Sequence, residues 1–321
     1  MRLKFSLLIL TLLLFGLNSF AQSFENELGF KSDNDAYLFY GQDRYYTNGL
    51  FLYFRHATKQ HRLGEKMEKL TYEVSAGQKM YNPISGYRPD PTTQDRPFAG
   101  YLYAAANINL FYNDEKIIKA GLEVGVVGPE ALGQETQELL HRTVGFYKIE
   151  GWKYQIANEL ALNFSAQYTQ LLLRSSKSNL DLSLETYVNL GSTFSGAGVG
   201  ILLRTGDLNQ LFNSAYTNAV VSNGSTTARF VNNEFFFYAK PQVNFVAYDA
   251  TMQGSMFENV SPVTFKPEPL VFAQQLGVNY TNRRFTFDFG LMFKSKEVKS
   301  TARRHQYGTI AMYYRFGKSS L

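Results

Sequence analysis

Strict alternation of apolar and polar residues is the feature that most constrains how this chain folds. It is clearest in the segment RRFTFDFGLMFKS, where one face collects Phe and Leu and the other collects polar or small residues. The first face consists of Phe285, Phe287, Phe289, Leu291 and Phe293, and the second of Thr286, Asp288, Gly290, Met292 and Lys294. Successive side chains of a strand point to opposite faces, so a strand of about 10 residues with one lipid-compatible face indicates a transmembrane β-barrel.

The same alternation recurs in KIIKAGLEVGVVG, NLDLSLETYVNLG, EFFFYAKPQVNFVAY and the last segment, YGTIAMYYRFG. In lipid, strands satisfy all their backbone groups only when the sheet closes. We therefore expect an all-β protein, a transmembrane antiparallel β-barrel of about twelve strands that forms one domain over residues 22–321. A soluble β-sandwich is the alternative, but the many Phe and Leu residues on the apolar faces favour the barrel.

Residues 1–21 predict a secretory signal peptide. Arg2 and Lys4 precede an apolar run, and the small residues Ser19 and Ala21 stand before a plausible cleavage point. The apolar run is short for a membrane helix, which needs roughly 20 residues, so cleavage is favoured over an uncleaved anchor. An exported barrel of this kind is expected in the bacterial outer membrane.

Composition agrees with strands and excludes some chemistry. The chain has 22 Tyr and 27 Phe against a single Trp, and it has no Cys, so no disulfide or thiolate metal site can form. The net charge of +5 is small and spread along the chain, and nothing in it points to a nucleic-acid partner.

One segment, GPEALGQETQELLHRTVGF at 128–146, breaks the alternation and predicts a short helix. Pro129 suits its first turn and Gly145 its C-terminal cap. Helical spacing places Gln134, Gln137 and His141 on one face. His141 is the candidate general base, although a histidine that only bonds within a loop helix would show the same pattern.

The other three histidines are weaker candidates. His56 and His61 lie in RHATKQHRLGEK, which is expected to be a solvated loop, and His305 follows two arginines in a basic turn.

A second polar group opens the stretch SDNDAYLFYGQDRYYTNGLFLYF. Asp33, Asn34 and Asp35 carry oxygens that could bind a cation, and they could equally form an ordinary Asx-rich turn.

Several separated blocks resemble the outer-membrane lipid A 3′-O-deacylases of the LpxR type. These blocks are NDAYLFYGQDRYYTNGL (34–50), GQKMYNP (77–83), QDRPFAGYLYA (94–104), and GVVGPEALGQETQ leading into HRTVG and GWKYQI (125–156). The second half of the chain resembles the family only as alternating strands. The resemblance implies a twelve-stranded barrel that removes the ester-linked 3′ acyloxyacyl chain from lipid A, with calcium dependence and an active site between barrel and outer leaflet.

The resemblance also implies the site residues. His141 matches the catalytic histidine that activates water, Asn34 and Asp35 match the Asn-Asp pair of the site, and Thr47 matches its threonine. Arg88 falls about where the family has a lysine. Asp35 and Asn34 would then contribute to a Ca²⁺ site, the substrate would be lipid A or lipopolysaccharide within outer-membrane lipid, and we expect a monomer.

The chain departs from the family six residues after the histidine, where a carboxylate is replaced by Tyr147. Hard cations prefer carboxylate, carbonyl and water oxygens. Either Glu150, Asp33 or a water takes its place, or metal binding is weakened.

Two other functions remain open from the sequence. An outer-membrane phospholipase with a serine nucleophile would need a serine near the histidine, and Ser85 and Ser165 are the nearest before and after it in sequence. A non-enzymatic barrel, either a pore or a structural protein, would have an open or polar lumen.

Overall fold

The chain forms a closed antiparallel β-barrel of twelve strands in the computed structural model, which describes residues 23–38, 43–60, 63–224 and 227–318. The predicted fold class and strand number are confirmed, whereas the predicted signal peptide and His61 lie outside the described residues. The strands are β1 (Phe24–Asn34), β2 (Tyr45–Ala57), β3 (Met67–Asn82), β4 (Ala99–Tyr112), β5 (Lys116–Val127), β6 (Glu159–Arg174), β7 (Leu180–Gly191), β8 (Phe194–Asp207), β9 (Glu234–Asp249), β10 (Leu270–Thr281), β11 (Phe285–Lys294) and β12 (His305–Lys318).

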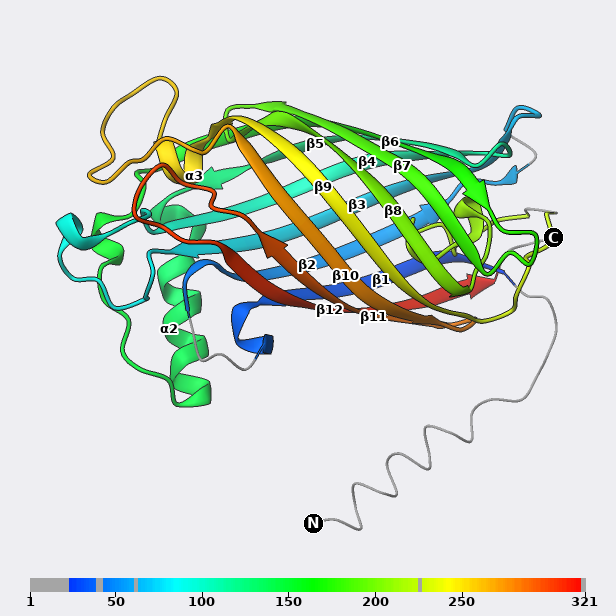
Figure 1. Ribbon diagram of the computed structural model, residues 1–321, viewed down its shortest axis with the longest axis horizontal. Helices are drawn as coiled ribbons and strands as arrows, with labels where there is room; N and C mark the ends of the chain where they lie inside the picture. The colour runs from blue at the N-terminus through cyan, green and yellow to red at the C-terminus, as the bar shows by residue number, and fades with distance from the viewer. Residues whose placement is uncertain (1–22, 39–42, 61–62, 225–226, 319–321) are drawn as a thin grey trace, which may run out of the picture.

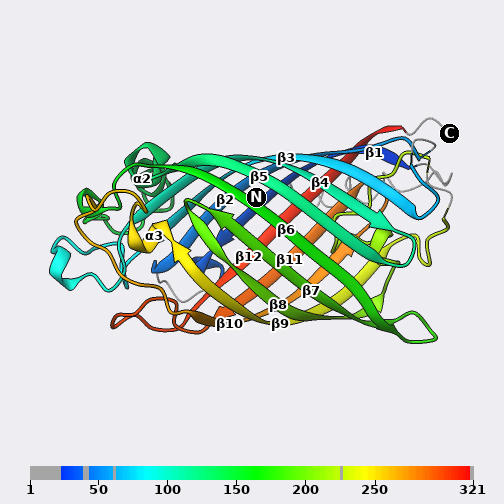
Figure 2. The ribbon, with the colours of Figure 1, turned by 90° about the horizontal axis from the view of Figure 1, so that it is seen from above.

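Pairing of the first strand with the last closes the sheet. β1 runs antiparallel to β12 from Phe24 opposite Lys318 to Asn34 opposite Gly308. The strands lie diagonally across both walls of the barrel (Figure 2), and the closed sheet leaves no edge of unpaired backbone groups.

The predicted faces of the strands agree with their burial. On β11, Phe287, Phe289 and Phe293 are exposed on the outside, while Thr286 and Gly290 are buried. The outer wall is thus apolar, and the alternation that predicted the strands sets which side chains meet lipid.

The helices gather at one end of the barrel (Figure 1). They are α2 (Gly133–Val144) and α3 (Ala250–Gln253), together with the 3-10 turns η1 (Asp35–Leu38), η3 (Pro91–Thr93), η4 (Pro129–Ala131) and η5 (Trp152–Tyr154). A further 3-10 turn, η6 (Leu211–Asn213), follows β8 at the opposite end, where β1 begins and β12 ends. No helix in the described ranges is long and apolar enough to span a membrane.

The helix predicted at 128–146 is divided in two. Leu132 has a left-handed backbone with φ of 56°, which ends η4 and starts α2 one residue later. Pro129 therefore belongs to the 3-10 turn and not to the first turn of the helix. Gly145, with φ of 75°, caps α2 as predicted.

Two histidine placements differ from the sequence interpretation. His56 lies within β2, where its Nδ1 is 2.8 Å from Asn26 Oδ1, so it is not in a solvated loop. His305 is the buried first residue of β12, and its Nε2 lies 2.8 Å from the Tyr46 carbonyl. At both positions the strand extends into a segment whose charged residues had indicated a loop or turn.

Paired charges lie inside the lumen, toward the end of the barrel where β1 begins. Arg55 Nη1 contacts Glu27 Oε1 at 2.7 Å and also pairs with Glu73, while Arg315 Nη1 contacts Glu27 Oε2 at 2.6 Å. Buried charges are tolerated when each one finds opposite charge and hydrogen bonds. The inward face can carry these charges because each one is paired with a charge of opposite sign.

The connection between β8 and β9 folds into the barrel mouth at the end opposite α2. Its residues 208–215 and 219–223 are buried, and they are tied to strands around the mouth. Lys69 Nζ donates to Asn213 Oδ1 at 2.6 Å, Arg204 Nη1 donates to Ser214 Oγ at 2.6 Å, and the Ser222 amide donates to the Phe24 carbonyl at 2.8 Å. We call residues 208–223 the plug.

Because the plug closes one mouth of the barrel, the purified barrel should insert into a planar lipid bilayer without producing stable conductance steps. Replacing residues 209–232 by a short Gly-Ser turn should open a pore, since Asp207 already pairs with Phe235 and a hairpin can join the strands. A deletion of residues 256–260 at the opposite end is the control and should stay closed. Steady conductance by the unaltered chain would contradict this prediction.

Candidate active site

The predicted site residues gather at the outer rim of the barrel, where β1 leaves the sheet. Leu28 and Phe30 are exposed on the outer face of β1, so alternation also turns Ser32 outward. The chain then folds back as η1, and the Tyr37 hydroxyl pairs with Ser32 Oγ at 2.8 Å. η1 therefore lies against the outside of the wall.

Helix α2 and the turn η4 before it pack on the outer face of β3 and β4. Gln78 of β3 donates its Nε2 to the Ala131 carbonyl at 2.6 Å. Gly100 of β4 permits the close approach, because a Cβ there would lie 3.2 Å from the Gly133 nitrogen. This packing sets the buried His141 at the rim.

A β-bulge places Thr47. The pairing of β2 with β3 shifts between Tyr46 and Asn48, so Thr47 has no partner of its own in the ladder. Tyr46 points inward and donates its hydroxyl to Asp33 Oδ2 at 2.7 Å. The extra residue turns the Thr47 hydroxyl to Asp35 and Asp43.

Asp43 is the centre of the cluster. Its Oδ2 accepts from Gln137 Nε2 at 2.8 Å and from the Tyr147 hydroxyl at 2.9 Å, and it lies 3.0 Å from His141 Nε2. Its Oδ1 accepts from the Thr47 hydroxyl. One carboxylate thus joins β2 and α2 to the loop after α2.

His141 is held at both ring nitrogens. Nδ1 lies 2.7 Å from the Tyr147 carbonyl, which can only accept, so Nδ1 carries a proton. Burial of the ring acts to lower its pKa, but hydrogen bonds to Asp43 and the Tyr147 carbonyl, with the negative charges of Asp43 and Asp35, outweigh burial and raise the pKa. The arrangement favours an imidazolium paired with Asp43.

Asp35 shares the Thr47 hydroxyl with Asp43. Desolvation, helped by the charge of Asp43 and opposed by a hydrogen bond from the Arg44 amide, raises the pKa of Asp35 to about 8. One hydroxyl proton cannot serve two carboxylates at once. A proton on Asp35 would complete a chain in which Asp35 donates to Thr47 and Thr47 donates to Asp43.

Trp152 orients the amide of Gln137. The indole Nε1 donates to Gln137 Oε1 at 2.8 Å, which leaves the amide nitrogen to face Asp43. Trp152 is itself buried among Met80, Phe98 and Ile149. The only tryptophan of the chain therefore supports the site from behind.

The structure brings together three of the five predicted catalytic residues, His141, Asp35 and Thr47. Asn34 is one residue away, but its Oδ1 accepts from the Ala36 amide at 2.6 Å and so closes a local turn. Arg88 lies in the loop after β3, where its amide donates to the Glu150 carbonyl at 2.7 Å. Within the described part of the chain, no hydrogen-bond partner is found for its buried Nε.

Two proposed substitutes for the missing carboxylate lie apart from the cluster. Asp33 faces the lumen, where its Oδ1 accepts from Thr309 at 2.7 Å. Glu150 is tied through its backbone to Gly86 and Arg88. Tyr147 keeps contact with the site instead, through its hydroxyl to Asp43 and its carbonyl to His141.

Sequence reasoning missed Asp43. It lies inside the block that carries the family resemblance, four residues before Thr47, and this spacing was the available signal. Gln137 was placed on the helix face with His141 but received no role, whereas Gln134, on that same face, bonds Glu138 instead at 2.9 Å.

The oxygen donors at the cluster suit a hard cation in type, although they are few. Over the described ranges, no group of three or more His, Asp and Glu side chains is positioned to hold a metal ion. Asp35 and Asp43 nevertheless stand close enough for their charges to interact, and each retains acceptor capacity beside Thr47. Two carboxylates and a hydroxyl, completed by water, are ligands that Ca²⁺ accepts.

A closed, lipid-facing barrel with a His–carboxylate cluster on its outer rim defines an outer-membrane β-barrel with an external polar site. The profile of the family described as "Outer membrane protein LpxR" matches residues 7–316, and the chain belongs to this family.

Solved structures agree on the fold. LpxR from Salmonella typhimurium superposes with a TM-score of 0.73 at 20% identity, covering 90% of this chain and 100% of that one. The β domain of the Bordetella autotransporter BrkA gives a TM-score of 0.50 at 8% identity, covering 92% and 100%. Comparison with curated protein sequences finds no match.

Replacing Asp43 by Asn should lower the pKa of His141, because the imidazolium loses the negative charge that it faces at 3.0 Å. NMR titration of histidine-labelled protein in detergent micelles can follow the four histidines separately. Glu135→Gln, an exposed carboxylate on the same helix, is the control and should leave the titration unchanged. An unaltered His141 titration in Asp43→Asn would show that the pair does not govern the imidazole.

Proposed function

We propose that this protein is a lipid A 3′-O-deacylase that hydrolyses the ester of the 3′ acyloxyacyl chain. Family membership supports the substrate class, and the position of the cluster supports the chemistry. The observation that carries the proposal is the His141–Asp43 pair on the outside of the rim, where a lipid of the outer leaflet can reach it. A cluster inside the plugged lumen would have no such access.

His141 is proposed to act as the general base. The Tyr147 carbonyl keeps a proton on Nδ1, so Nε2 is the nitrogen that can accept one from water. A neutral ring would turn the lone pair of Nε2 toward Asp43 Oδ2, which is an unfavourable contact of two acceptors. At 3.0 Å the two atoms leave no room for a water, so the Asp43 carboxylate would have to turn aside to admit one that donates a proton to each. Transfer of one proton to Nε2, as the water oxygen attacks the ester carbonyl, would then yield the imidazolium.

Asp35, Asp43 and Thr47 are the residues proposed to hold Ca²⁺, with Asn34 contributing only if its oxygen leaves the Ala36 amide. A bound cation would supply stabilisation of the negative charge that develops on the ester carbonyl oxygen. Arg88, with its buried and unpaired Nε, is proposed to bring a second positive group to the substrate.

The serine mechanism has less support. Ser85 lies near the cluster, and its hydrogen bond to the Tyr147 hydroxyl acts to lower the pKa of Tyr147, which burial raises. Ser85 Oγ also accepts from the Tyr87 amide at 3.1 Å, and within the described part of the chain no hydrogen bond joins it to either nitrogen of His141. Since one chain supplies every residue of the cluster, we also propose that the monomer is the active form.

His141→Gln should lower deacylation of purified lipid A by about 10²–10⁴-fold, the usual contribution of a general base. Mass spectrometry of the released acyl chain measures the rate. His56→Gln, in β2 beside Asn26, should keep nearly full activity. Loss of less than about tenfold in His141→Gln would rule out the base role, and loss in Ser85→Ala instead would favour the serine mechanism.

The rate of the unaltered enzyme should rise with pH through an apparent pKa above the ordinary value of about 6.5, because the neutral form of His141 is the base and its pKa is raised.

Calcium affinity should increase with pH up to about 8, because the cation must displace the proton from Asp35. Below that pH the apparent affinity should fall about tenfold per pH unit. Calorimetric titration in detergent measures this without any substrate. Asp35→Asn should abolish the dependence and Asp33→Asn, on the lumenal side, should preserve it; the reverse result would place the cation on Asp33.

A further inference from the structure

We propose that a groove on the outer wall of the barrel holds the acyl chain that is being removed and thereby sets the chain length the enzyme accepts. The inference rests on the proposed function, because it takes the ester to lie at His141. It adds a binding site some distance from the chemistry.

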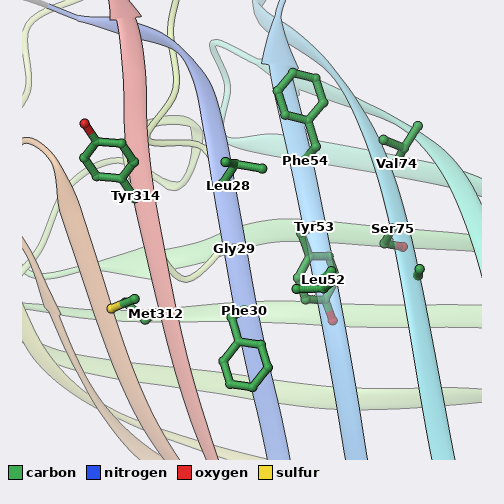
Figure 3. A pocket seen from close by; sticks show the side chains of 11 residues that line it. Leu28, Gly29, Phe30, Leu52, Tyr53, Phe54, Val74, Ser75, Met312 and Tyr314 are labelled. Carbon is green, nitrogen blue, oxygen red and sulfur yellow. The ribbon is translucent and has the colours of Figure 1, made fainter.

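The groove spans β12, β1, β2 and β3 and encloses about 570 Å³. Figure 3 shows Leu28 and Phe30 on β1, Leu52 and Phe54 on β2, and Tyr314 on β12 around it. These side chains are all exposed on the outer face of the barrel.

A small residue, Ala76 of β3, leaves the space open between larger neighbours. It is exposed and lies opposite Leu52 in the ladder, beside the exposed Val74 on its own strand. Gly29, Tyr53 and Ser75 also line the groove, but they occupy the alternate positions, whose side chains point to the lumen.

Hydrocarbon is the chemistry that the groove fits. Its outward side chains are apolar apart from the Tyr314 hydroxyl, and the backbone of its four strands is paired within the barrel. A polar ligand would find few partners there, whereas an alkyl chain loses nothing and gains contacts. The barrel lies in the outer membrane, so alkyl chains surround this wall.

The groove lies on β1 and β2, the two strands that lead to the candidate active site. Phe30 lies five positions before Asp35 on β1, and Leu52 lies five positions after Thr47 on β2. At a rise of about 3.4 Å per residue, the near end of the groove is roughly 17 Å from the cluster. A long acyl chain whose ester sits at His141 can reach the groove, and a short one cannot.

Ala76→Trp tests the proposal by filling the groove. Ala166→Trp is the matched control, because Ala166 is also an exposed alanine on the outer face, but on β6. Deacylation is measured in mixed micelles on lipid A preparations that differ only in the length of the 3′ acyl chains, and the heat-dependent gel shift reports folding. Leu52→Ala, which widens the groove, serves as a second variant.

The unaltered protein should prefer long chains. Ala76→Trp should lose about tenfold or more on long chains while changing little on short ones, a loss within the range that hydrophobic pockets give for misfit. Ala166→Trp should keep the original profile, and Leu52→Ala should discriminate less between lengths.

The two proposals fail in different ways. If the unaltered protein is active and the chain-length profile of Ala76→Trp and Leu52→Ala matches that of Ala166→Trp, the groove is not a binding site and the proposed function stands. If the unaltered protein releases no acyl chain from any lipid A, the proposed function is wrong and the groove inference falls with it. If Ala76→Trp does not fold, the Leu52→Ala profile decides.

Discussion

Backbone hydrogen bonding in a medium without water is the constraint on which the rest of the structure depends. Each strand must pair on both edges, so the first strand must find the last. The pairing of β1 with β12 does this over the whole length of β1. It also fixes the candidate site, because η1 continues from β1 and packs against the outside of the wall. Closure of the sheet therefore determines where Asp35 can stand.

The plug and the paired charges of the lumen leave the outer rim as the place where a polar cluster and a lipid can meet. Arg55, Glu27 and Arg315 compensate one another inside the barrel, and the plug occupies one mouth. On the outside, Gly100 allows α2 to approach the wall, and the bulge at Thr47 turns a hydroxyl to the same spot. Two local departures from regular geometry thus build a polar cluster beside an apolar surface.

The fold could be predicted from the alternation of apolar and polar residues, because every strand in a membrane needs an apolar outward face. Phe287 and Phe289 provide that face on β11. The spacing to Thr47 could have marked Asp43, but its contacts could not be predicted, because its partners Gln137 and Tyr147 are 94 and 104 residues away in sequence. Asn34 and Asp35 are adjacent in sequence, yet one closes a turn and the other enters the cluster. The backbone changes direction between these two residues, so their similar side chains point to different places. The residue types alone do not reveal that change of direction.

The balance of charge explains how the cluster tolerates Tyr147 where its relatives are expected to have a carboxylate. Asp35 and Asp43 repel each other, and a third carboxylate would add to the repulsion and demand a cation. Tyr147 instead donates a proton to Asp43 and offers only a neutral carbonyl to His141. The remaining two carboxylates can be neutralised by the His141 imidazolium and by a proton on Asp35, whose pKa of about 8 makes that proton available near neutral pH. The cation proposed for this cluster would compete with that proton for one position, and the tyrosine would shift the competition toward the proton.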